Sequence, residues 1–229
     1  MKAIVIVTQK KWNIKNFYKL QNIFKNYNLC LITEQQNLTL QNLQKINPKY
    51  IFFPHWSYKI QPEIYNNFSC IVFHMSDLPY GRGGSPLQNL ITRGIKHTKI
   101  SALEVNDVLD GGDIYLKSDL DISKGSAKKI YKKASKIIFF DMISYIVKNN
   151  PTPTSQVGKI EIFKRRKREE SNIITLTNKN LNSIYDFIRM LDAPTYPRAF
   201  IELDNFKIEF SNAKKNKKTI SGRFKIYEK

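Results

Sequence analysis

The chain contains three histidines, and two of them, His55 and His74, follow short apolar runs that predict buried strands. Asp110 follows a third such run and precedes two glycines. A carboxylate beside an imidazole orients the ring and favours its protonated form, which suits proton transfer during catalysis. We therefore predict that His74 and Asp110 form a catalytic pair, with His55 as a further catalytic candidate.

Apolar strands alternate with amphipathic helices through the first two thirds of the chain. Strands are expected at residues 3–7, 28–33, 50–53, 69–73, 100–105 and 114–117, and helices at 13–27, 38–46, 88–93 and 126–148. Continuous β-branched runs are typical of strands buried on both faces of a parallel sheet. The pattern predicts an α/β fold, a Rossmann-like open, mostly parallel sheet, whose ligands bind beyond the carboxyl ends of strands.

The composition of residues 149–155, rich in Asn, Pro and Thr, predicts a linker. Beyond it we expect a short strand at 159–163, a helix near 179–191 and two strands near 198–210. The predicted organisation is a catalytic domain over residues 1–150 and a small C-terminal α+β subdomain over residues 151–229.

The chain has 229 residues, of which 41% are hydrophobic, enough for a sizeable core, and a net charge of +19. This excess favours anionic partners such as phosphate, nucleic acid or a membrane surface, but a solvated lysine-rich surface explains it equally well. Cys30 and Cys70 lie in apolar runs and are expected as free thiols of a reducing compartment. No stretch is suited to a signal peptide or a membrane span, so a soluble cytoplasmic protein is expected.

The sequence lacks the motifs of several common reaction types. The histidines and Asp110 lack metal-ligand spacing, so no metal site is predicted. No nucleophile elbow, phosphate-binding loop or dinucleotide fingerprint occurs. The residues alone therefore indicate an α/β enzyme with a His/Asp pair.

The stretch HMSDLPYGRGGSPL at 74–87, with Ile-Thr-Arg-Gly at 91–94 and Leu-Asp-Gly-Gly at 109–112, resembles the N10-formyltetrahydrofolate-dependent formyltransferases. That family's pattern is Asn-x-His-x-Ser-x-Leu-Pro, an Arg-Gly turn and a later Asp-Gly or Asp-x-Gly loop. Segments 163–171 and 184–200 also resemble the family, so the likeness spans roughly residues 50–213.

The resemblance implies an N-formyltransferase that moves a formyl group from the co-substrate N10-formyltetrahydrofolate to a primary amine. His74 and Asp110 would handle the protons. Two loops would hold the folate through Trp56, Ser57, Tyr58, Lys59, Ile60, Val105, Asn106, Asp107 and Leu109.

The segment around His55 and His74 is similar to sugar formyltransferases of the pseudaminic-acid type. The part of the chain beyond Asn150 is shorter than the usual appendage of methionyl-tRNA formyltransferases. The resemblance therefore implies an amino-sugar nucleotide as the acceptor, such as a UDP-linked 4-amino-4,6-dideoxy sugar used in surface-glycan or flagellin-glycan biosynthesis. It would be bound by Ser76, Arg82, Gly83 and Gly84. Neither a membrane nor a nucleic acid is expected as a partner, and a homodimer is left open.

One position departs from the family pattern: Val72 stands where the family has its catalytic asparagine. Valine cannot donate a hydrogen bond to a developing oxyanion. Either His55 or another group replaces the donor, or His74 and backbone amides suffice, or activity is lost. His55 has a structural alternative, packing against Trp56 or capping a turn.

Two other functions stay open. The first is an enzyme like methionyl-tRNA formyltransferase, in which the basic run 164–168 and the lysines at 214, 215, 217 and 218 bind tRNA phosphates. The second is a non-catalytic protein that binds folate or a nucleotide, which the valine at position 72 suggests.

Overall fold

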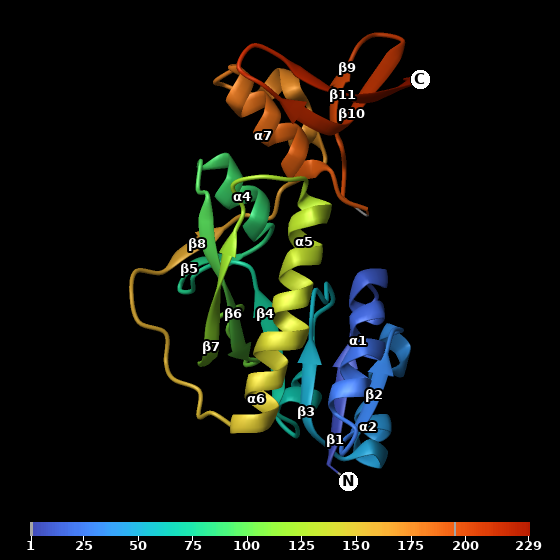
Figure 1. Cartoon of the computed structure of the whole chain (residues 1–229), viewed down its shortest axis with the longest axis vertical. Helices are drawn as coiled ribbons and strands as arrows, with labels where there is room; N and C mark the ends of the chain where they lie inside the picture. Colours follow the sequence, from blue (N-terminus) through green and yellow to red (C-terminus); the bar gives the residue numbers. More distant parts are fainter. Residues whose placement is uncertain (1, 195) are drawn as a thin grey trace. The chain divides into compact units, whose positions relative to one another are not determined.

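Parallel strands joined by helices build the central sheet of the computed structural model, which describes residues 2–194 and 196–229. Its order is β2-β1-β3-β4-β6-β7 (Figure 1). The strands are β1 (Ala3–Val7), β2 (Asn28–Ile32), β3 (Pro48–Phe53), β4 (Cys70–His74), β6 (His97–Glu104) and β7 (Ile114–Asp121). β1 pairs in parallel with β2 and β3, and β3 pairs in parallel with β4. β6 runs antiparallel to β4.

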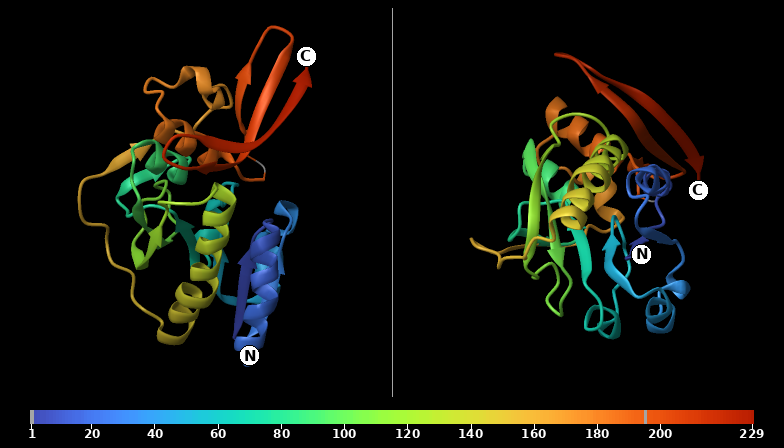
Figure 2. Two further views of the ribbon diagram at one scale, coloured as in Figure 1. Left: turned by 45° about the horizontal axis from the view of Figure 1, so that its top comes forward. Right: turned by 60° about the horizontal axis from the view of Figure 1, so that its bottom comes forward.

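Helices cover both faces of this sheet. They are α1 (Lys11–Ile23), α2 (Leu40–Ile46), α3 (Pro62–Tyr65), α5 (Ala127–Lys136) and α6 (Ile143–Asn149), with the 3-10 turn η1 (Gln35–Asn37) and the π-helical turn η2 (Ile137–Met142). Leu43 of α2 and Ile64 of α3 pack in one buried cluster with Val5 and Val7 of β1. Side chains alternate along a strand, so Ile4 and Ile6 face the other side, and the right-hand view of Figure 2 shows α1 and α2 on opposite sides of β1 and β2.

The predicted fold is confirmed: the sheet is mostly parallel and a small β subdomain follows near the C-terminus. Buried β-branched runs produced the expected strands because burial on both faces requires apolar residues at every position. An apolar run does not reveal the direction of its strand, and the structure shows that β6 runs opposite to the parallel strands β1 to β4. The loop after β6 therefore begins beside Cys70, at the start of β4, where the Val105 amide donates to the Cys70 carbonyl at 2.9 Å.

The chain divides into two compact units. The first takes in the residues up to 82, with 99–120 and 132–162, and the second takes in 83–98, 121–131 and the residues from 163 onward. β5 (Tyr80–Gly83) and β8 (Glu161–Phe163) form a separate two-stranded sheet. The domain boundary expected at residue 150 stays a prediction.

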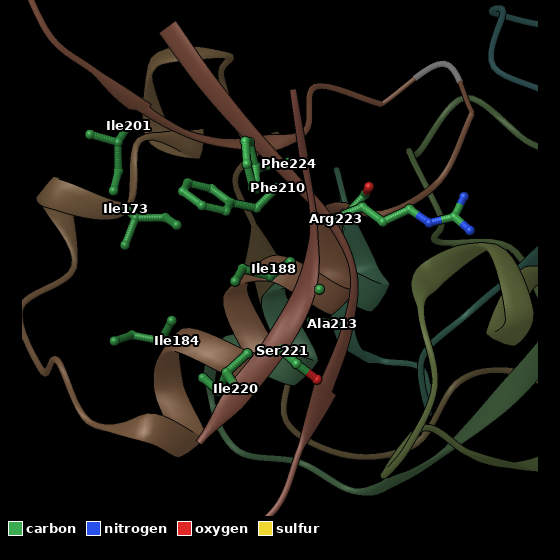
Figure 3. A pocket seen from close by; sticks show the side chains of 12 residues that line it. Ile173, Ile184, Ile188, Ile201, Phe210, Ala213, Ile220, Ser221, Arg223 and Phe224 are labelled. Atoms are coloured by element: carbon green, nitrogen blue, oxygen red, sulfur yellow. The ribbon is translucent and has the colours of Figure 1, made fainter. Parts of the chain in front are cut away.

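The second unit contains an antiparallel sheet and the helices α4 (Pro86–Thr92) and α7 (Leu181–Leu191). The sheet has the order β11-β10-β9, and its strands are β9 (Ala199–Glu202), β10 (Phe206–Lys215) and β11 (Ile220–Glu228), with the 3-10 turns η3 (Glu169–Ser171) and η4 (Ile173–Thr175) before them in the chain. Asn180 and Ser183 form a reciprocal capping box that starts α7. A cavity of about 360 Å³ is lined by residues of α7 and of the β10–β11 hairpin (Figure 3). Ile188 and Phe210 line it, whereas Arg223 points away from these apolar side chains.

Both cysteines are free, with Cys70 buried and Cys30 half-buried. Burial raises the pKa of the Cys70 thiol to about 12, so this thiol is inert at neutral pH. Among the described residues, no helix is long and apolar enough to cross a bilayer.

Candidate functional site

His74 ends β4 and is 8% exposed. Its Nε2 atom lies 2.7 Å from the carbonyl oxygen of Gly81. The buried Ser76 hydroxyl donates to the same carbonyl at 3.3 Å. The chain therefore turns back after β4 and places a backbone acceptor against the imidazole.

Asp110 reaches His74 from the loop between β6 and β7. Its Oδ2 atom lies 3.4 Å from Nδ1 of His74, so the structure brings together the two residues expected to form a pair. Asp110 has a φ of 53°, in the left-handed region that few residues other than glycine adopt without strain. Gly112 lies so close to the Glu104 carbonyl that a side chain there would clash. The loop is therefore held in an unusual conformation at the point where it presents the carboxylate.

Both ring nitrogens of His74 face oxygen acceptors, Gly81 O on one side and the Asp110 carboxylate on the other. The ring therefore has an oxygen atom facing each of its nitrogens, a geometry in which it can pass a proton to or from a substrate atom.

Val72 lies two residues before His74 on β4 and so projects from the same face of the strand. It packs against an apolar cluster of Leu78, Leu103 and Ile114. At the position of the family's asparagine, the Val72 side chain thus makes apolar contacts and supplies no hydrogen-bond donor beside His74.

Gln156 is a site residue that the sequence analysis missed. Its Nε2 atom donates to the carbonyl oxygens of Asp110 and Gly112, at 2.9 and 2.8 Å. Its Oε1 atom accepts from Nε and Nη2 of Arg82, at 3.1 and 2.9 Å. The composition of the neighbouring stretch indicated only a linker, and a single glutamine carries no motif that would have pointed to this position.

The expected substrate-binding residues lie in different parts of the fold. Ser76 and Arg82 belong to the first unit, and Gly83 and Gly84 to the second. A Cβ on Gly84 would lie 2.5 Å from the Cα of Arg165, so this glycine permits close backbone packing. Their role in substrate binding stays a prediction.

His55 lies in the turn after β3, with a φ of 53°. Its Nδ1 atom is 3.3 Å from Nδ2 of Asn13, and its ring meets that of Trp12 edge-on at 6.3 Å. Asn13 also donates to Thr8 Oγ1 and to the Pro54 carbonyl, at 2.8 and 2.9 Å. Burial, helped by the charge of Lys10, lowers the pKa of His55 to about 4, so the ring is neutral at pH 7. These contacts with Trp12 and Asn13 of α1 favour a structural role for His55, whereas its expected packing against Trp56 and its catalytic role both stay predictions.

The two loops expected to hold folate each place one side chain against the same buried apolar cluster. Trp56 and Val105 both pack against the side chains that include Phe53 and Ile60. The Trp56 and Tyr58 rings lie 5.1 Å apart, while Ser57 and Lys59 do not belong to that cluster. In the second loop the Asn106 side chain accepts from the Val108 amide at 3.0 Å, and Asp107 and Leu109 are exposed.

The indole Nε1 of Trp56 is buried and has no hydrogen-bond partner among the residues that the structure describes. A buried donor of this kind is costly unless a ligand or water accepts its hydrogen bond. Over the same residues, no group of three or more His, Cys, Asp or Glu side chains is arranged to hold a metal ion.

Comparison with known proteins decides the family. The model of the formyl transferase family matches residues 2–137, which is more than half of the 229 residues. The chain belongs to the formyl transferase family. A second model, for the C-terminal domain of methionyl-tRNA formyltransferase, matches residues 168–227.

Three relatives of this formyl transferase are informative. The solved structure of the methionyl-tRNA formyltransferase from Clostridium thermocellum has 49% identity and a TM-score of 0.96, over 100% of both chains. The methionyl-tRNA formyltransferase of Thermodesulfovibrio yellowstonii is 26% identical over 69% of this chain and 51% of its own length, so the chain spans about half of that curated relative. HypX from Aquifex aeolicus, solved in complex with tetrahydrofolic acid, has 14% identity and a TM-score of 0.74, over 92% of this chain and 37% of HypX, and shows the fold alone.

These comparisons confirm the enzyme class expected from the sequence, an N-formyltransferase whose family uses N10-formyltetrahydrofolate. They correct the acceptor. The expectations of a sugar-nucleotide substrate and of no nucleic-acid partner are wrong, because the 49% identical structure and the C-terminal family model both belong to methionyl-tRNA formyltransferases. The part of the chain beyond Asn150 was a misleading guide to the acceptor, because the match to the Clostridium thermocellum structure extends over 100% of both chains.

Proposed function

We propose that this formyl transferase moves a formyl group from N10-formyltetrahydrofolate to the amino group of methionyl-tRNA. The observation that carries the proposal is the 49% identity with the Clostridium thermocellum methionyl-tRNA formyltransferase over the whole of both chains. The family model matched by residues 168–227 supports it independently, because that model describes the C-terminal part of the same class of enzyme.

The folate would lie on the loops that carry Trp56 and Val105. Their packing on one cluster provides an apolar wall, and the buried Trp56 Nε1 offers a donor to a ring heteroatom or carbonyl. The co-substrate supplies the activated formyl group when it is bound. An apolar wall with a few polar groups is the usual make-up of a small-molecule site.

His74 and Asp110 would carry out the proton transfers. The attacking amine loses a proton as its nitrogen bonds to the formyl carbon, and the departing nitrogen gains one. His74 is placed to move that proton, with Asp110 orienting its Nδ1 side at 3.4 Å. A donor aimed at a developing oxyanion is worth roughly 2.7–4 kcal/mol. With Val72 at the family's asparagine position, that stabilisation falls to His74 and to backbone amides, or to His55.

The β10–β11 hairpin would contact the tRNA. Exposed lysines gather around its turn, at positions 214, 215, 217 and 218, and Arg223 and Lys225 are exposed on β11. Cations at such positions bind phosphates and release counterions, which supplies affinity without sequence specificity. The net charge of +19 is then explained in part by the acceptor.

A turnover assay tests the proposal. The chain is incubated with N10-formyltetrahydrofolate and methionyl-tRNA, and the released amino acid is analysed by mass spectrometry. We expect N-formylmethionine to accumulate over many turnovers. The position occupied by Val72 favours one other candidate, a protein that binds folate and tRNA without catalysis, and saturable binding without product would identify it.

A further inference from the structure

The segment after α6 returns to the active site instead of serving as a free linker. The amide of Ile114 donates to the Thr154 carbonyl at 2.7 Å, and the amide of Thr154 donates to the Ile114 carbonyl at 3.0 Å. This bridge fixes the segment at the start of β7. Gln156, two residues further on, is thereby placed beside the loop that carries Asp110.

The Gln156 amide uses its full hydrogen-bonding capacity at this position. A glutamine side chain has two N–H hydrogens and one carbonyl oxygen that can accept twice. Here the two hydrogens go to the carbonyls of Asp110 and Gly112, and the oxygen accepts both hydrogen bonds from Arg82. No other common side chain of this length both donates twice and accepts twice.

The two groups joined by Gln156 are the two that flank the His74 ring. Asp110 presents its carboxylate to Nδ1, and Gly81, the residue before Arg82, presents its carbonyl to Nε2. We infer that Gln156 is a positioning residue for formyl transfer: it joins the Asp110 loop to the Gly81–Arg82 strand and so sets the orientation of the His74 imidazole. The activity part of this inference rests on the proposed function, whereas the effect on the His74 ring does not.

A merely structural role would also fit a half-buried, fully bonded amide, and two substitutions separate the roles. Gln156→Glu keeps an oxygen acceptor for Arg82, so the segment stays tethered, but it removes both donors to the Asp110 loop. Gln156→Met is close in shape and removes both sets of hydrogen bonds. Ser155→Ala, at an exposed neighbouring position, is the matched control.

The first readout is the ¹H–¹⁵N spectrum of the histidine side chains, recorded at neutral pH. The spectrum contains the signals of three imidazole rings, and those of His74 are identified by their absence in His74→Ala. In both Gln156 variants the His74 signals should move toward their positions in Asp110→Asn, while those of His97 and the Ser155→Ala spectrum stay unchanged. His74 signals that remain at the wild-type positions in Gln156→Glu overturn the inference. If Gln156→Met fails to fold, the Glu variant alone decides.

The second readout is turnover with methionyl-tRNA. Misorientation of a catalytic group by about 1 Å can cost 10²-fold, so kcat should fall by about 10–100-fold in Gln156→Glu with KM for the folate little changed. Unchanged kcat in Gln156→Glu, with an active wild-type chain, contradicts the positioning role. An inactive wild-type chain whose His74 signals still respond to the substitutions contradicts the proposed function and leaves the positioning inference standing.

Discussion

Gly112 lies against the carbonyl oxygen of Glu104, with no room for a Cβ between the two backbones. The contact closes the loop that begins after β6 and carries Asp110 to His74. An alanine at position 112 would collide with rigid backbone, so the loop would have to move. The position of the Asp110 carboxylate thus depends on the absence of a side chain two residues later.

Gly112→Ala should therefore lower kcat by about 10²-fold, the cost expected for misplacing a catalytic group by about 1 Å. The matched control is Gly94→Ala, a position of positive φ with no atom within 4 Å of an added Cβ. Both variants should lose some thermal stability, Gly94→Ala because of its positive φ and Gly112→Ala because of the collision with the Glu104 carbonyl. Equal kcat in the two variants would show that the Asp110 loop tolerates displacement.

Removing either member of the His/Asp pair should remove proton transfer. General acid–base catalysis typically contributes 10²–10⁴-fold, so we expect His74→Ala and Asp110→Asn to lower kcat by about that factor. His97→Ala is the control, since the His97 side chain is 78% exposed and lies 3.9 Å from Asp121, outside the site. Near wild-type kcat in either variant of the pair would refute its assignment.

The strands near the site were predictable, and the reason is physical. Continuous apolar runs at β1, β3 and β4 follow from burial on both faces of a parallel sheet. Ligands of such sheets bind at the carboxyl ends of the strands, where His55 follows β3 and His74 ends β4. β5 was missed because Gly81 and Gly83 favour a turn, and β11 was missed although its apolar and polar residues alternate, because most of its residues are exposed and no buried apolar run marks it. Gln156 was missed because tertiary hydrogen bonds leave no local pattern.

His55 should make stability depend on pH. Its pKa is lowered to about 4, whereas a histidine in the unfolded chain titrates near 6.5. Between these values the unfolded chain binds a proton that the folded chain does not, so the free energy of unfolding should fall as the pH drops from about 6.5 to about 4, by up to about 3 kcal/mol. Denaturant titrations at several pH values measure this. His55→Gln should lack this part of the pH dependence, and His97→Gln should retain it.

The same residue tests how the oxyanion is stabilised. From its contacts with Asn13 and Trp12, we expect His55→Ala to lower the melting temperature while the folded protein keeps most of its kcat. A fall in kcat of about 10²–10³-fold with little change in KM would instead identify His55 as the donor that replaces the family's asparagine.

The hairpin lysines test the acceptor. Replacing the lysines at 214, 215, 217 and 218 with glutamine should raise KM for methionyl-tRNA and lower the salt dependence of tRNA binding by about one unit of slope for each lysine–phosphate interaction that is removed. Replacing four exposed lysines of α5, at 128, 129, 132 and 136, changes the net charge equally and is the control. Identical salt slopes for the two variants would remove the hairpin from the tRNA interface.

The central claim is that this chain formylates the amino group of methionyl-tRNA at the His74–Asp110 site. The most direct measurement is the initial rate of formyl transfer from N10-formyltetrahydrofolate to methionyl-tRNA, with a UDP-linked 4-amino-4,6-dideoxy sugar as the competing acceptor and His74→Ala as the inactive reference. We predict multiple turnovers on methionyl-tRNA, no formylated sugar, and loss of product in His74→Ala. Formylated sugar in place of formylmethionyl-tRNA, or a wild-type rate equal to that of His74→Ala, would contradict the account.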